Sequence, residues 1–150
     1  MEQVTANQMT FDYEAGGEGL PVVLLHGFPE SAASWEPVAS RLWDAGLRTY
    51  APNQRGYSPG ARPTDVAAYA LDQVTADVIA LADAWGLAEF HLVGHDWGAA
   101  AAWSVAAHHP ERVTTLTAVS VPHLAAFGWA LAHDPDQQQR STYMRLFRDG

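Results

Sequence analysis

An apolar run, a tight turn between two glycines and an alanine-rich stretch follow one another near the middle of this chain. This order constrains the fold more than any other feature. The apolar run His91–Val93 leads into Gly94, and Gly98 opens the run Ala99–Ala102. A strand that turns this sharply into a helix needs close backbone approach and strained dihedrals, which the glycines permit. Asp96 stands midway between them, so the pattern predicts a nucleophile elbow with a raised carboxylate.

The acid at the centre of this turn limits the chemistry. A carboxylate that attacks a saturated carbon forms an ester, which water can later cleave at the enzyme's own carbonyl. A serine that attacked the same carbon would leave an inert ether. Asp96 therefore favours displacement at an epoxide or carbon–halogen carbon over esterase or protease chemistry. The structural alternative is that Asp96 is only an N-cap of the following helix.

A second motif lies upstream of the first. The buried-strand run Pro21–Leu25 is followed by the sequence His26-Gly27-Phe28-Pro29, in which glycine and proline end the sheet pattern. We expect this loop to donate one backbone amide, that of Phe28, to an oxyanion hole, and the amide of Trp97 to supply the other. The two amides would stabilise the negative charge that develops while an ester on Asp96 is hydrolysed.

Three motifs, in this order and spacing, resemble those of the α/β-hydrolase superfamily and, within it, the epoxide hydrolases. They are His26-Gly27-Phe28-Pro29, the turn Arg55-Gly56-Tyr57-Ser58, and Gly94-His95-Asp96-Trp97-Gly98. The resemblance extends over nearly the whole chain. It implies that Asp96 is the nucleophile, that Phe28 and Trp97 are the oxyanion donors, and that a cis peptide bond precedes the proline of the first motif.

The segment 143–148 is similar to the part of the family's helical cap that bears one of two tyrosines bonded to the epoxide oxygen. The resemblance implies that Tyr143 binds substrate in this way. A phenol, with an ordinary pKa of about 10, stays protonated at neutral pH and can stabilise the alkoxide released when the ring opens. The alternative is an ordinary tyrosine on an amphipathic helix, packed against the sheet domain.

The chain departs from the family in three respects. The family continues past the point that corresponds to Gly150, and its later segments hold a general-base histidine and an acidic partner. Without that pair the chain would alkylate itself once and not turn over. We expect His26 to bond the loop backbone and His95 to support packing of the loop. Asn53 replaces a usual aspartate and Ala99 a usual glycine, and we expect neither to affect the reaction. The histidines, none of which matches the base, are His26, His91, His95, His108, His109, His123 and His133.

Short apolar runs alternate with helical periods along the chain, as in βαβ units. The predicted fold class is α/β, a doubly wound and mostly parallel sheet of the α/β-hydrolase type, truncated, with the start of a helical cap. Residues 1–121 would form the N-terminal part of the core and residues 122–150 the beginning of the cap. We expect Leu124, Phe127 and Leu131 of this cap to be partly exposed.

The expected elements follow from periodicity and from glycine and proline positions. A helix capped by Ser34 should place Trp35, Val38, Leu42 and Ala45 on one face and end at Gly46. A long loop should span residues 52–65. The predicted strands cover residues 9–14, 22–25, 48–51, 89–93 and 113–119. The other predicted helices cover residues 71–85, 97–108, 123–133 and 134–147.

The amino-acid composition argues against some classes of protein and of binding partner. The chain has no cysteine, a net charge of −9 and arginine as its only basic residue besides histidine. These features argue against a disulfide framework and a nucleic-acid partner, and the sequence shows no export signal or membrane-spanning run. We expect a cytoplasmic bacterial enzyme that acts on a small apolar substrate, an epoxide or a related compound, with no cofactor, metal or membrane. The sequence permits a homodimer without choosing it over a monomer.

Other functions remain open from the sequence. In a haloalkane dehalogenase the indole of Trp97 would hold the leaving halide, but Phe28 stands where such enzymes usually carry a halide-binding asparagine. Haloacid relatives tend to have arginine directly after the nucleophile. The same fold also supports other hydrolytic or lyase reactions. Finally, the chain could be a non-catalytic fragment or a ligand-binding remnant, because the water-activating base is not among its residues.

Overall fold

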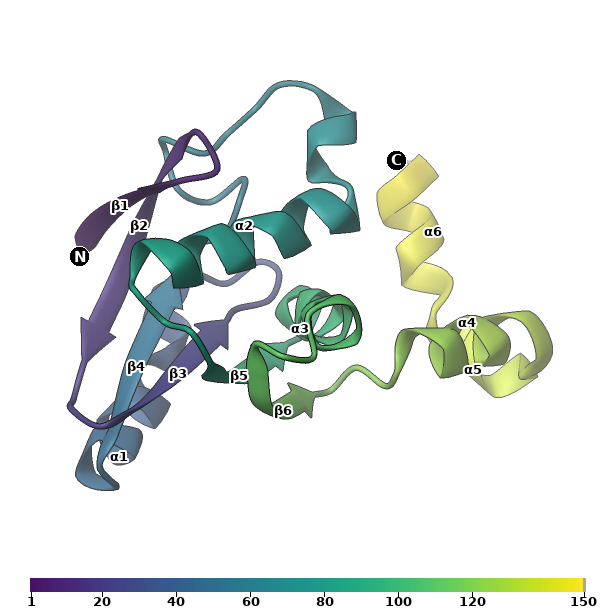
Figure 1. Ribbon diagram of the computed structural model, residues 1–150. Coiled ribbons are helices and arrows are strands. Elements are labelled where there is room, and N and C mark those ends of the chain that lie inside the picture. Colours follow the sequence, from purple (N-terminus) through teal and green to yellow (C-terminus); the bar gives the residue numbers. More distant parts are fainter. Residues whose placement is uncertain (150) are drawn as a thin grey trace.

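The computed structural model describes residues 1–149, with side chains up to residue 147, so the predicted end of the cap at Gly150 lies outside the described residues. Six strands, six α-helices and two 3-10 helices make up this part of the chain (Figure 1). In order they are β1 (Glu2–Ala6), β2 (Met9–Gly16), β3 (Leu20–Leu25), η1 (Ala32–Trp35), α1 (Glu36–Asp44), β4 (Leu47–Pro52), η2 (Val66–Tyr69), α2 (Leu71–Ala84), β5 (Phe90–His95), α3 (Trp97–His108), β6 (Val113–Val119), α4 (Leu124–His133), α5 (Pro135–Arg140) and α6 (Thr142–Asp149).

The strands form one sheet in the order β1-β2-β4-β3-β5-β6. The four strands from β4 to β6 in this order are parallel, and β1 and β2 form an antiparallel hairpin at one edge. The predicted mostly parallel sheet and its early antiparallel strand are therefore confirmed. Strand β1 was not predicted, because its five residues are too few to show a clear apolar alternation. In the structure only Ala6 of these residues is buried.

Helices cover both faces of the sheet (Figure 1). On one face, α2 and α3 pack over β3 and β5, with Val78, Val105 and Leu92 at the centre of that core. On the other face, η1 and α1 pack over β3 and β4, with Leu24 and Trp35 buried between them. The two clusters take alternate residues of β3, as a strand buried on both faces requires. This arrangement is the doubly wound one predicted.

The helix predicted from Ser34 begins later than expected. A 3-10 turn comes first, and α1 starts at Glu36. Because a 3-10 turn advances three residues instead of 3.6, it shifts the phase of the buried face. Trp35 and Ala39 are buried, whereas Val38 is 43% exposed, so the prediction that Val38 shares one face with Trp35 was wrong.

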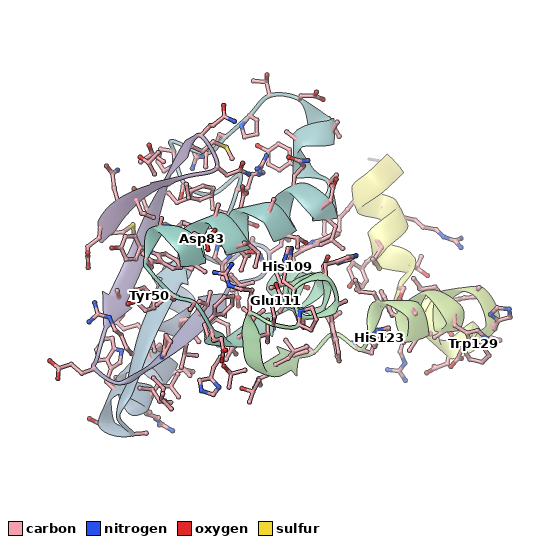
Figure 2. All side chains as sticks on the ribbon, viewed as in Figure 1. Tyr50, Asp83, His109, Glu111, His123 and Trp129 are labelled. Atoms are coloured by element: carbon pink, nitrogen blue, oxygen red, sulfur yellow. The ribbon has the colours of Figure 1, made fainter. Side chains whose placement is uncertain are left out.

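Helices α4, α5 and α6 lie to one side of the sheet, joined to β6 by residues 120–123 (Figure 1). Figure 2 places Trp129 on this helical unit, well away from the sheet. Leu124, Phe127 and Leu131 are half-buried, as expected. The single helix predicted over 134–147 was wrong, because α5 ends at Arg140 and α6 begins at Thr142, with Ser141 between them at φ −92° and ψ 8°.

None of the helices within residues 1–149 has the length and apolar character needed to span a bilayer.

Candidate active site at the ends of β3 and β5

The two predicted motifs meet at one edge of the sheet. Strands β3 and β5 are parallel neighbours, with Leu25 paired to Gly94, so the chain leaves both strands at the same level. From β3 the chain crosses to β4 on one side, and β5 lies on the other. Such a reversal of strand order opens a crevice at the carboxyl ends of the strands, where α/β proteins bind ligands.

The turn between β5 and α3 is strained at the predicted residue. Asp96 has φ 53° and ψ −120°, a conformation that costs about 1–3 kcal/mol for a residue with a side chain. The flanking glycines make this turn possible. A Cβ on Gly94 would collide with the carbonyl group of Gly98, and a Cβ on Gly98 with the carbonyl oxygen of Leu25. The structure thus has the elbow geometry that the glycine spacing predicts.

The side chain of Asp96 does not cap α3. Its backbone carbonyl starts the helix by accepting from the amides of Ala99 and Ala100, at 2.9 and 3.1 Å. Its carboxylate Oδ1 instead accepts a hydrogen bond from the backbone amide of Phe28, at 2.9 Å. The N-cap alternative therefore does not explain this residue, and Asp96 and Phe28 are brought together as the sequence predicted.

Gly27 lies directly against the carboxylate. A Cβ at this position would come within 2.9 Å of Asp96 Oδ1. The loop therefore needs glycine here for the Phe28 amide to reach the acid. The bond between Phe28 and Pro29 is cis, which confirms the isomer implied by the family resemblance.

The second expected oxyanion donor is the backbone amide of Trp97. Trp97 is the first residue of α3, and its indole is 63% exposed. Within residues 1–149 its amide forms no hydrogen bond to the carboxylate of Asp96. An oxyanion hole is arranged around charge that develops during reaction, not around the resting group. The donor role of Trp97 stays a prediction.

Tyr143 lies on α6 and is 55% exposed. Its ring meets that of Phe147 edge to face, with centroids 6.0 Å apart, and Phe147 meets Phe28 in the same way at 6.0 Å. This series of aromatic rings joins α6 to the loop that contacts Asp96. The structure brings Tyr143 to the site's side of the molecule, and its role toward substrate stays a prediction.

His26 has the structural role predicted for it. The ring is buried, its Nδ1 donates to the carbonyl of Gly27 at 2.9 Å, and its Nε2 accepts from the amide of Gln54 at 3.1 Å. Burial lowers the pKa of His26, because the charged form of the ring would lack the hydration it has in water. Both ring nitrogens are thus committed to the loop. The side chain of Gln54, which also donates to the His26 carbonyl, was not predicted.

Glu30 was also missed. Its carboxylate faces the ring of His95, with Nδ1 and Oε2 3.1 Å apart, and it also accepts from the amide of Gly27 at 3.4 Å. The predicted loop-supporting role of His95 is confirmed by this contact. The only signal in the sequence was an acid two residues after Phe28, which by itself resembles any polar loop residue.

A buried ion pair holds the loop that follows β4. Arg55 donates to Asp77 through Nε and Nη2, each at 2.6 Å, and to the carbonyl of Ala68 through Nη1 at 2.8 Å. The hydrogen bond to Asp77 raises the pKa of Arg55 further above its ordinary value. The same loop carries Tyr57, whose pKa is raised by burial and then by the negative charge of Asp96. Tyr57 therefore belongs to the surroundings of the carboxylate.

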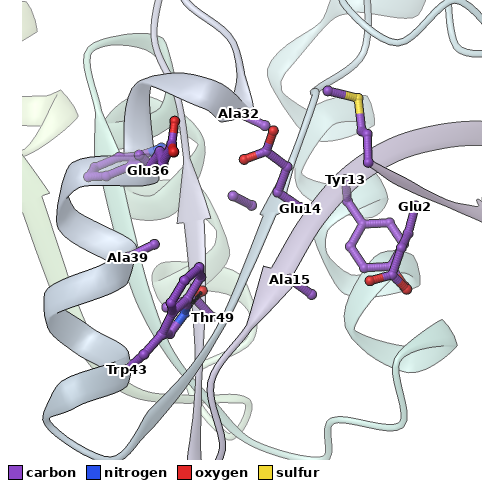
Figure 3. Close-up of a pocket in the computed structure, with 12 residues that line it drawn as sticks. Glu2, Tyr13, Glu14, Ala15, Ala32, Glu36, Ala39, Trp43 and Thr49 are labelled. Carbon is purple, nitrogen blue, oxygen red and sulfur yellow. Dashed lines mark hydrogen bonds between the residues drawn. The ribbon is translucent and has the colours of Figure 1, made fainter.

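A separate cavity of about 320 Å³ lies between α1 and strands β2 and β4 (Figure 3). Glu14, Glu36 and Trp43 are among its lining residues, and none of Phe28 or the residues of the elbow is. The site at the sheet edge and this cavity are thus different places. In the part of the chain that the structure describes, no group of three or more metal-binding side chains comes together.

Comparison with known proteins agrees with this geometry. The profile of the alpha/beta hydrolase fold family matches residues 21–150. The chain is 46% identical to epoxide hydrolase A of Mycobacterium tuberculosis over 112 residues, which cover 74% of this chain and 35% of the relative. It is 35% identical to the AB hydrolase superfamily protein YfhM of Bacillus subtilis over 147 residues, 97% of this chain and 51% of the relative.

Solved structures give the same result. An epoxide hydrolase variant from Bacillus megaterium, crystallised with a naphthyloxy-propanediol product, superposes with a TM-score of 0.91 at 30% identity and covers 97% of this chain and 51% of that one. Epoxide hydrolase VrEH1 from Vigna radiata superposes with a TM-score of 0.78 at 35% identity, over 81% and 39%. The chain spans about half the length, or less, of the relatives that it matches. On its fold, its elbow and these matches, this chain belongs to the α/β-hydrolase fold family.

Proposed function

We propose that this chain carries the nucleophile of an epoxide hydrolase. An oxygen of Asp96 attacks an epoxide carbon, the bond from that carbon to the ring oxygen breaks, and an alkyl ester forms on the carboxylate. The ring oxygen takes the bonding electron pair and a proton from the phenol of Tyr143. Water then attacks the ester carbonyl, a base takes the proton that the water loses and returns it to the phenolate of Tyr143, and the diol leaves as the carboxylate is regenerated. The amides of Phe28 and Trp97 stabilise the charge on the carbonyl oxygen during this second step.

The observation that carries the proposal is the contact between the Phe28 amide and a carboxylate held at a strained turn. The hydrogen bond fixes the orientation of the carboxylate, one oxygen of which attacks carbon. A serine in the same place would belong to a different chemistry. The names of the relatives, several of which are epoxide hydrolases, support the same substrate class.

The second step needs a base, and the nearby histidines are poorly suited to this task. His26 is buried with both ring nitrogens bonded, and neither His26 nor His95 matches the position at which the family that the motifs resemble carries its base. We therefore assign the activation of water to a His/acid pair other than these residues. Residues 1–121 would supply the core of the enzyme, and the helices from residue 122 onward would begin a cap that brings Tyr143 over a small apolar substrate.

The test is stoichiometric alkylation. Incubation with an aryl epoxide should add the mass of one epoxide to the peptide that contains Asp96, as measured by peptide mass spectrometry. Asp96→Asn and Asp96→Ser should abolish the adduct, whereas the matched control Asp44→Asn, at an exposed acid at the end of α1, should retain it. A folded sample without an adduct would refute the proposal. An adduct from a primary alkyl bromide and none from the epoxide would favour a dehalogenase instead.

A further inference from the structure

We infer that Glu30 and His95 are positioning residues, which hold the backbone amide of Phe28 against the carboxylate of Asp96. We call this pair the clamp. The inference rests on the proposed function, because it assigns the clamp a role in the reaction of Asp96. Neither residue is placed in contact with the substrate, so their effect passes through the loop that carries Phe28.

The clamp connects the loop to the sheet at its end. Glu30 Oε2 accepts from Nδ1 of His95 at 3.1 Å and from the amide of Gly27 at 3.4 Å. Since a carboxylate only accepts, Nδ1 of the ring must be the donor in this pair. The amide of Glu30 in turn donates to the carbonyl of Gly27 at 3.0 Å, which closes the loop into a turn.

The clamp joins the same two segments as the hydrogen bond between Phe28 and Asp96. Phe28 lies between Gly27 and Glu30, the two ends of the closed turn, and Asp96 directly follows His95. The 2.9 Å hydrogen bond from the Phe28 amide to Asp96 therefore spans the same two segments that the clamp joins. A shift of the loop relative to β5 would lengthen both contacts together.

Apolar packing does little to hold the tip of the loop. The side chain of Phe28 is 54% exposed, and Pro29 is exposed as well. The orientation of the Phe28 amide must then come from the polar contacts of the turn. Among these, the contact between Glu30 and His95 ties the turn to the strand that leads into the nucleophile.

The exposure of the clamp predicts that its loss affects the reaction rate more than the stability of the protein. The side chains of His95 and Glu30 are 33% and 37% exposed, so solvent screens their attraction and their contribution to stability is small. Alignment of reacting groups is far more sensitive, because a displacement of about 1 Å can lower a rate by about 100-fold. Loss of the clamp should therefore change the reaction while leaving the stability nearly unchanged.

The experiment uses Glu30→Ala, His95→Phe and the double variant, with two measurements. Hydrogen exchange of the Phe28 amide, followed by NMR, reports on the contact itself, and the rate of Asp96 alkylation by an aryl epoxide reports on the reaction. Each single variant should speed exchange and slow alkylation by about 10-fold to 100-fold. The double variant should be little worse than either, because both changes remove the same contact.

Two further variants sharpen the test. Glu30→Gln keeps an oxygen that can accept from His95 and should restore most of the alkylation rate lost in Glu30→Ala. The matched control is Glu111→Ala, which removes a carboxylate 3.8 Å from His109 at the other end of α3 (Figure 2). This control should leave both the Phe28 exchange and the alkylation rate unchanged.

The outcomes separate the two proposals. If Glu30→Ala and Glu30→Gln both leave Phe28 exchange and alkylation at the wild-type rates, the clamp is overturned, whatever the enzyme does. If the wild-type protein is not alkylated but Phe28 exchange still depends on Glu30 and His95, the clamp is supported and the proposed function fails. Additive effects in the double variant would also count against the clamp.

Discussion

The sheet edge that holds Asp96 and the helical unit α4–α6 are built in opposite ways. At the edge, the backbone is strained at Asp96, and hydrogen bonds such as those of Asp96 with Phe28 and of His26 with Gly27 hold the two loops. In the helical unit, large apolar side chains are exposed, and an aromatic contact between Phe147 and Phe28 links α6 to the site loop. The proposed nucleophile Asp96 is thus positioned by the core, whereas the proposed proton donor Tyr143 lies on an element that few contacts join to the sheet.

Adding one methyl group should have opposite effects in the two regions. Gly98→Ala places a Cβ against the carbonyl oxygen of Leu25 and should lower the free energy of unfolding by about 3 kcal/mol. Gly128→Ala, in the middle of α4 with no atom within 4 Å of the new Cβ, should raise it by about 0.5 to 1 kcal/mol. Chemical denaturation of both variants checks this. Equal effects of the two changes would show that the regions do not differ in packing.

Acid should affect the sheet edge through His26. Burial lowers the pKa of this ring below its ordinary value of 6.5, so the unfolded chain binds a proton more readily than the folded one. The stability is therefore fully present above about pH 6.5 and falls as the pH drops below it, by up to about 1.4 kcal/mol per pH unit. Denaturation at pH 7.5 and 5.5 should show that the free energy of unfolding falls less between these two pH values in His26→Gln than in the wild-type protein.

The control for this pH prediction lies in the helical unit. His133, at the end of α4, is exposed. His133→Gln should therefore keep the full pH dependence of the wild-type protein. If His26→Gln and His133→Gln show the same dependence on pH, burial of His26 is not its source.

The smallest expected effect concerns the link between the two regions. Phe147→Ala removes the rings' contact with Phe28 and Tyr143 and should change the free energy of unfolding by no more than about 1 kcal/mol. It should nonetheless speed hydrogen exchange throughout α6, since that contact ties the helix to the loop. The matched control is Leu146→Ala, at a residue of α6 that is 71% exposed. It should leave hydrogen exchange in α6 unchanged. Equal exchange rates in both variants would show that the aromatic contact does not hold α6.

The elements with strong local signals were predicted closely. The bounds of α3 and β6 agree with the structure, because a run of alanines between Gly98 and the histidines and a β-branched run after Arg112 leave little choice. The errors arose where local signals compete. Strand β1 forms because β2 offers it an edge to pair with, and the break between α5 and α6 lies at the single residue Ser141, which the hydrophobic pattern does not mark.

The candidate site divides in the same way. The contact between Asp96 and Phe28 could be predicted, because both residues follow apolar strands and carry the glycines that such turns need. The roles of Glu30 and Gln54 could not, because a polar loop residue has the same appearance in a sequence whether it faces solvent or a neighbouring strand. Asn53 was expected not to affect the reaction. Its side chain accepts a hydrogen bond from the amide of Ala32 and so joins the end of β4 to η1.

The sequence by itself determined the family, the parallel sheet and the strained acid, because glycine spacing and apolar periodicity are local properties of the chain. Only the tertiary structure decided which groups meet across the ends of β3 and β5, since these contacts join residues about 65 positions apart, such as Glu30 and His95. Such pairings depend on strand order and register. No single segment of the sequence encodes them, and they determine where the amide of Phe28 points.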